Sequence, residues 1–143
     1  ISGAKESVES AVNEIKAQIE GINAVFLNVS APFHSRLMQS IEADFLSFLF
    51  KFSFDLQKSK QVLSNFSGTF HSADTLIDYL VKQISGSVRW IENMKALINT
   101  KSPIVEIGPN RPLGKFFSTL GVETSSILNL RGMKKAFQSE ANS

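Results

Sequence analysis

Hydrophobic positions in the first third of the chain switch between helical and extended spacing. Residues 8–19 carry apolar side chains at intervals of three and four, which predicts a helix with one buried stripe, capped by Ser2 and ended by Gly21. Residues 24–29 form a short, almost entirely apolar run that includes the β-branched Val25 and Val29, which predicts a strand covered on both faces. The helical period returns over residues 37–49, so we expect a second helix there.

The rest of the chain alternates strand patterns with helix patterns. Short β-branched runs predict strands and a 3.6-residue period predicts helices, each bounded by Gly, Pro or Ser. In chain order we expect a strand at 61–66, helices at 73–83 (capped by Ser72) and 90–98, a strand at 104–107, a helix after Pro112 and a strand at 125–128. Strands separated by helices imply an α/β fold with a mostly parallel sheet and flanking helices, in which ligands gather at the carboxyl ends of strands.

Two strand ends carry residues that could take part in binding or catalysis. The predicted strand at 24–29 runs into Ser30–His34, and the strand at 104–107 runs into Gly108–Asn110. We therefore expect a site at these loops. A lone histidine before an apolar helix is, without further information, more often a packed or surface residue than a catalytic one. The other histidine, His71, lies in an expected loop with no partner motif, so we expect its side chain to be solvated.

Composition narrows the class of protein. The 143 residues are 43% hydrophobic and 20% charged, which suits a soluble globular domain with one sizeable core. The apolar clusters are interrupted before the roughly 18 residues that a membrane span needs, and no basic-then-apolar leader opens the sequence. The chain has no Cys, so it offers no disulfide, thiolate nucleophile or Cys-based zinc site. We expect a cytoplasmic protein with no membrane partner.

Charge argues against nucleic-acid binding. The formal net charge is only +2 and the basic residues are scattered, so the footprint of a polyphosphate binder is absent. A mild basic excess near the end most simply forms a solvated surface; it comprises Arg111, Lys115, Arg131, Lys134 and Lys135.

Several short strings occur in an order that resembles one known family. They are Ile-Ser-Gly at 1–3, Ser-Ala-Pro-Phe-His-Ser at 30–35, Leu-Ser-Asn at 63–65, Val-Lys-Gln-Ile at 81–84, Ser-Val-Arg-Trp at 87–90 and Val-Glu-Ile-Gly-Pro at 105–109. Together they resemble the second half of the malonyl-CoA:acyl-carrier-protein acyltransferases of bacterial fatty-acid synthesis and their polyketide-synthase relatives. Because the chain opens directly on a helical pattern without an initiator Met, we expect part of a longer or split protein.

The resemblance implies a specific architecture. Residues 1–29 would close a small ferredoxin-like subdomain, and residues 30–143 would form the C-terminal part of an α/β-hydrolase-like large subdomain. The family nucleophile is a serine on a Gly-x-Ser-x-Gly elbow, and an arginine binds the substrate carboxylate. The sequence contains no Gly-x-Ser-x-Gly. We therefore assign no nucleophile, no carboxylate-binding arginine and no metal ligand to this chain.

Four residues match positions of the family's site. His34 matches the general base, and Gln83 matches a glutamine whose backbone carbonyl accepts a hydrogen bond from the imidazole. A helix N-terminus behind His34 would favour the neutral ring. Asn65 matches a polar supporting residue, and Phe33 matches the position that selects malonyl over methylmalonyl. The simpler alternatives are a polar helix end for Gln83 and a core aromatic for Phe33.

The implied function is transfer of malonyl from malonyl-CoA to the phosphopantetheine thiol of an acyl-carrier protein, without a cofactor. The basic residues near the end could dock an acidic carrier. Two alternatives stay open: a noncatalytic or partner-dependent half that needs an N-terminal half on a separate chain, and a thioester or ester hydrolase of similar fold. The isolated chain is expected to be inactive, since it has no nucleophile.

Overall fold

The computed structural model describes residues 1–134, so Lys135 of the basic group lies outside the described residues. The chain divides into two compact units, the first spanning Ile1–Trp90 and the second beginning at Ile91. The named elements of the first unit are helices, and the second unit combines helices with a small sheet. Among the described residues, the only regular sheet is a two-stranded parallel one in the second unit.

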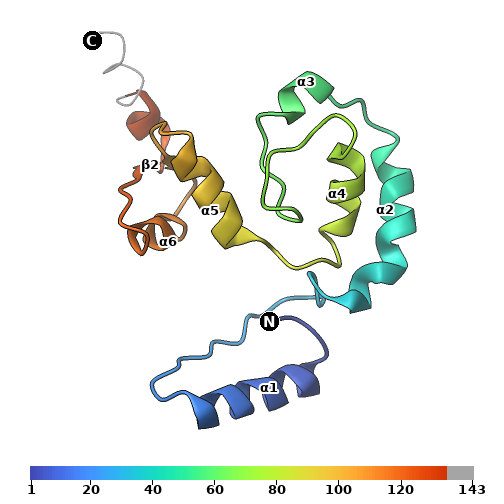
Figure 1. The fold of residues 1–143 in the computed structure, drawn as a ribbon, viewed down its shortest axis with the longest axis vertical. Helices are drawn as coiled ribbons and strands as arrows, with labels where there is room; N and C mark the ends of the chain where they lie inside the picture. Colours follow the sequence, from blue (N-terminus) through green and yellow to red (C-terminus); the bar gives the residue numbers. More distant parts are fainter. Residues whose placement is uncertain (135–143) are drawn as a thin grey trace. The chain divides into compact units, whose positions relative to one another are not determined.

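The first unit opens with helix α1 (Lys5–Gln18). Its N-cap is Ala4, which provides no side-chain hydrogen bond, so the prediction that Ser2 caps the helix is wrong. Gly21 has a φ of +79°, which suits the turn that follows the helix. Residues 22–29 then run back along α1 as an unpaired extended segment (Figure 1). The strand predicted at 24–29 does not form, because no strand of the described chain lies beside it to complete a ladder.

The helix predicted over 37–49 is divided in two. A 3₁₀ helix, η1 (Arg36–Ile41), precedes the α-helix α2 (Glu42–Leu49). A single turn, α3 (Leu56–Ser59), follows, and Asp55 caps it by accepting hydrogen bonds from the backbone N–H groups of Gln57 and Lys58. Helix α4 (Leu76–Lys82) lies beside α2 (Figure 1). Four apolar side chains of these helices form the core of the first unit: Met38, Leu49, Leu76 and Val81.

The connection between α3 and α4 differs from the sequence prediction. The expected strand at 61–66 reduces to one antiparallel bridge between Leu63 and Phe70. The N-cap of α4 is Thr75, without a side-chain cap bond, so Ser72 does not cap this helix as predicted. The hydroxyls of Ser72 and Thr75 instead bond each other at 3.0 Å. His71, the residue after Phe70 of this bridge, is buried.

The second unit confirms the predicted parallel pairing. It contains most of α5 (Trp90–Asn99), then strand β1 (Val105–Ile107), helix α6 (Gly114–Ser118) and strand β2 (Ser125–Ile127). The strands are parallel, with Val105 opposite Ser125. The Glu106 carboxylate accepts hydrogen bonds from the backbone N–H groups of Leu113 (3.0 Å) and Gly114 (2.8 Å), which ties β1 to the start of α6.

In residues 1–134, no helix has the length and apolar character that crossing a bilayer would require.

Candidate functional site

The backbone at His34 is held in an uncommon conformation. Its φ is +62°, in the left-handed region that costs a non-glycine residue of order 1 kcal/mol. Such a conformation persists only where neighbouring bonds determine it. Two bonds do so here: the His34 N–H donates to the Ile84 carbonyl at 2.8 Å, and the Ser35 hydroxyl donates to the Pro32 carbonyl at 2.7 Å. The turn therefore fixes the direction of the His34 side chain.

The imidazole of His34 is bonded on one side and open on the other. Its Nδ1 lies 2.8 Å from the Gln83 carbonyl oxygen, the contact that the resemblance implied. A carbonyl can only accept, so Nδ1 carries the proton in the neutral ring and the lone pair of Nε2 is left available. The side chain is exposed and lies outside the core. This arrangement suits a general base, although the catalytic roles of His34 and Gln83 stay predictions.

The accepting carbonyls stand at the C-terminal end of α4, where backbone oxygens have no partner within the helix. The turn there is closed by the Ile84 N–H on the Val81 carbonyl (3.1 Å) and by the Gly86 N–H on the Lys82 carbonyl (2.8 Å). The sequence had suggested a helix N-terminus as the neighbour of the ring. The helix that follows His34 is instead the short η1, and the ring contacts a helix C-terminus.

The other two predicted site residues lie nearby in the chain. Phe33 is 46% exposed and directly precedes His34, so it is not a buried core aromatic. Asn65 is half-buried, and its backbone carbonyl accepts a hydrogen bond from the Arg89 N–H at 2.8 Å. The structure thus brings His34 and Gln83 into direct contact, and it links Asn65 to the segment that follows Gln83.

His71 is buried, so the prediction of a solvated side chain is wrong. It is only 6% exposed, and its ring lies 6.0 Å from that of Tyr79. The backbone N–H of His71 donates to the Val62 carbonyl at 2.9 Å, next to the bridge of Leu63 with Phe70, and holds this part of the loop in place. Burial lowers the pKa of the His71 imidazole from its usual 6.5, because desolvation disfavours the charged form.

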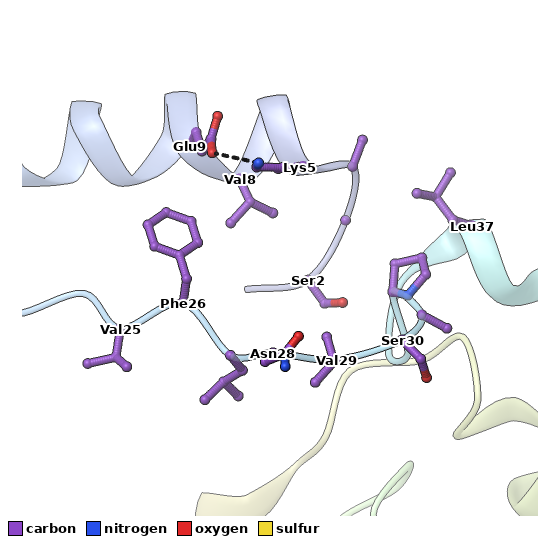
Figure 2. Close-up of a pocket in the computed structure, with 15 residues that line it drawn as sticks. Ser2, Lys5, Val8, Glu9, Val25, Phe26, Asn28, Val29, Ser30 and Leu37 are labelled. Carbon is purple, nitrogen blue, oxygen red and sulfur yellow. Dashed lines mark ion pairs between the residues drawn. The ribbon is translucent and has the colours of Figure 1, made fainter.

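A groove of about 710 Å³ lies between the first turns of α1 and residues 25–32. Figure 2 shows Val8 of α1 and Phe26 of the extended segment pointing toward one another across it, with the ion pair of Lys5 and Glu9 (3.9 Å) at its edge. Its lining is mostly apolar, and the paired charges leave no net charge to attract an anion. Lys5 and Glu9 are the charged side chains among its lining residues, and they pair with each other.

Sequence reasoning missed two contacts that shape the site. The Ile84 carbonyl holds the His34 backbone, and the Ser85 hydroxyl donates to a carboxylate oxygen of Glu42, the first residue of α2. Both contacts join residues more than forty positions apart, so no local pattern signals them. Among the described residues, no group of three or more His, Cys, Asp or Glu is placed to hold a metal ion.

Curated proteins with similar sequences share one description. The chain is 32% identical over 115 residues to the malonyl CoA-acyl carrier protein transacylase of Bacillus subtilis, covering 79% of this chain and 28% of that protein. It is 34% identical over 131 residues to the polyketide biosynthesis malonyl CoA-acyl carrier protein transacylase BaeC of Bacillus velezensis, covering 88% of this chain and 44% of that protein. The chain thus spans less than half the length of these relatives. No family model matches it.

Solved structures agree with the curated relatives. The malonyl-CoA:ACP transacylase of Synechocystis superposes with a TM-score of 0.73 at 28% identity, over 94% of this chain and 45% of that one. A malonyl-transacylase solved in complex with its type II polyketide acyl-carrier protein superposes with a TM-score of 0.83 at 27% identity, over 96% of this chain and 45% of that one. The chain therefore belongs to the malonyl CoA-acyl carrier protein transacylase family and matches a C-terminal portion of its members.

Proposed function

We propose that this chain supplies the histidine part of a malonyl CoA-acyl carrier protein transacylase active site. The observation that carries the proposal is the exposed His34 ring, whose Nδ1 is bonded to the Gln83 carbonyl at 2.8 Å. Residues 1–29 would belong to a ferredoxin-like subdomain and residues 30–143 to an α/β-hydrolase-like one. The structural likeness to whole transacylases supports this frame.

The chemistry follows from the free Nε2. His34 takes the proton from a serine hydroxyl that lies on polypeptide outside this chain, and the serine oxygen attacks the thioester carbonyl of malonyl-CoA. The imidazolium then protonates the departing thiolate of coenzyme A. The second half-reaction runs in reverse, with the phosphopantetheine thiol of an acyl-carrier protein as acceptor. The Gln83 carbonyl stabilises the imidazolium without a buried carboxylate, and no cofactor is needed.

Phe33 and Asn65 have secondary roles in this proposal. The Phe33 ring precedes the base and would occupy the space of an α-methyl group, a discrimination worth about 1–3 kcal/mol. Its 46% exposure in this chain leaves it available to face a substrate. Asn65 supports the site through its backbone bond to Arg89, just beyond the turn that holds His34.

The serine-bearing polypeptide would dock on the exposed extended segment, residues 22–29, of the first unit. Val25, Leu27 and Val29 are 74%, 76% and 66% exposed, which is unusual for apolar residues in an extended segment. An unpaired extended segment beside an apolar groove is suited to receive an added strand. In the second unit, the exposed Arg111 and Lys115 would attract an acidic carrier.

Complementation tests the proposal. The isolated chain is incubated with malonyl-CoA and an acyl-carrier protein, with and without a separately expressed N-terminal portion of BaeC that this chain does not match. We expect no malonyl adduct on the chain alone and, with the complement, malonyl on the complement's serine and then on the carrier, by intact mass. His34→Ala should slow transfer by about 10²–10⁴-fold, whereas Gln83→Ala should retain most activity because a backbone carbonyl makes the contact.

Three outcomes would count against the proposal. A malonyl adduct on the isolated chain would place a nucleophile within it. Unchanged transfer by His34→Ala would remove the base. Release of free malonate in place of malonyl-carrier would favour the hydrolase alternative.

A further inference from the structure

We propose that Glu42 is a positioning residue for His34 and acts through Ser85. The inference deepens the proposed function, which gives the orientation of His34 its chemical meaning. The contacts themselves belong to the fold of the first unit and can be tested without any transferase activity.

Three consecutive residues after α4 face the segment that begins at His34. The Gln83 carbonyl binds the His34 ring and the Ile84 carbonyl binds the His34 backbone N–H, each at 2.8 Å. The next residue, Ser85, donates its hydroxyl hydrogen to a carboxylate oxygen of Glu42. Glu42 and Ser85 are both half-buried, and a hydrogen bond to a carboxylate is about twice as strong as a neutral one. The same short turn is therefore fastened to the site and to α2.

The turn at residues 83–86 follows the last residue of α4, so contacts from outside the helix help to hold it. Lys82 is the last residue of α4, and the carbonyls of Gln83 and Ile84 beyond it have no intrahelical partner to orient them. On one side the turn is fixed by packing: a Cβ on Gly86 would lie 2.7 Å from the Phe66 ring and 2.8 Å from the Lys82 carbonyl oxygen. The bond from Ser85 to Glu42 fixes the other side. Without it, the two carbonyls lose the restraint that links their turn to α2.

The charges around α4 are consistent with this placement. The pKa of Lys82 is raised, mainly by its hydrogen bond to Asp78 at 2.8 Å, and attraction from Glu42 adds to the shift. Glu42 therefore lies close enough to the end of α4 to act on its last residue. Asp44, also in the first turn of α2, is exposed, and it offers a matched control.

The experiment reads the tautomer of His34 directly. The full chain is labelled with ¹⁵N, and the two ring nitrogens of His34 are followed by NMR at neutral pH in wild type and variants. We expect the Nδ1–H form to dominate in wild type and in Asp44→Ala. In Glu42→Ala its ratio to the Nε2–H form should fall at least several-fold. Glu42→Gln removes the charge but keeps an oxygen that can accept the Ser85 hydrogen bond, so it should restore most of the wild-type ratio. If Glu42 acted through its charge, Glu42→Gln would shift the ratio as Glu42→Ala does.

Ser85→Ala removes the same hydrogen bond by deleting its donor, and it tests the proposal if Glu42→Ala does not fold. We expect it to shift the tautomer ratio as Glu42→Ala does. A wild-type ratio in folded Ser85→Ala would overturn the proposal, as would an equal shift in Asp44→Ala. Because the measurement uses no substrate, failure here leaves the complementation assay to judge the proposed function separately.

Discussion

Two regions of the first unit differ in how completely the chain organises them. Around His34, helices α2 and α4 bury Leu49, Leu76 and Val81 to 8% exposure or less, and hydrogen bonds cross between distant segments. In the region formed by α1 and residues 22–29, α1 has no buried residue, and Val25 and Leu27 are about three-quarters exposed. The surroundings of His34 are thus organised by contacts within the first unit, whereas the α1 region presents apolar surface that the rest of that unit leaves exposed.

The largest change in stability is expected from a pair of variants that replace one leucine by alanine in each region. Leu76→Ala removes a side chain that is 6% exposed and should lower the free energy of unfolding by about 2–5 kcal/mol. Leu27→Ala removes one that is 76% exposed and should change it by less than about 0.5 kcal/mol. Urea unfolding followed by circular dichroism measures both. Equal losses in the two variants would contradict the contrast.

Gly86→Ala sharpens the comparison within the turn that holds His34. An added Cβ would come within 2.8 Å of a backbone oxygen, which cannot move without shifting the end of α4. We expect a loss of about 1–3 kcal/mol, typical of overpacking. Gly108→Ala is the control, because a Cβ there meets nothing within 4 Å. Urea unfolding measures both variants, and equal unfolding midpoints for Gly86→Ala and Gly108→Ala would show that the turn is not tightly packed.

The sequence predicted the parts of this structure that depend on local pattern. The period of apolar residues located α1, α4 and α5, and the short β-branched runs located β1 and β2. The pairing of His34 with Gln83 came from resemblance, since nothing local links residues 49 positions apart. The contact is present, and the roles of these residues, of Asn65 and of Phe33 stay predictions.

The failures have a common physical cause. A β-branched run records a preference for extended backbone, but a strand also needs a neighbour, and residues 24–29 have none in the described chain. His71 looked like a loop residue because its burial depends on the bridge of Leu63 with Phe70 and on Tyr79. The bond of Glu42 to Ser85 is equally invisible, because each residue alone is an ordinary polar residue near a helix end.

The smallest expected effect is a pH dependence that belongs to the organised region alone. His71 is only 6% exposed, and its Nδ1 has no hydrogen-bond partner among the described residues. Burial lowers its pKa below 6.5, so the folded chain holds it neutral while the unfolded chain binds a proton as the pH falls through 6.5. Stability is then unchanged above this pH and decreases below it, down to the folded pKa.

Between pH 7.5 and 5.5 the loss from His71 should be no more than about 1.4 kcal/mol. One proton changes stability by at most about that amount per pH unit, and the unfolded imidazole binds its proton mainly in the lower unit of this window, below pH 6.5. Urea midpoints at the two pH values measure it. His71→Phe should flatten the profile across this window, since it keeps an aromatic ring beside Tyr79 but cannot bind a proton. A slope that survives His71→Phe would show that another group, and not the buried imidazole, senses acid in the organised region.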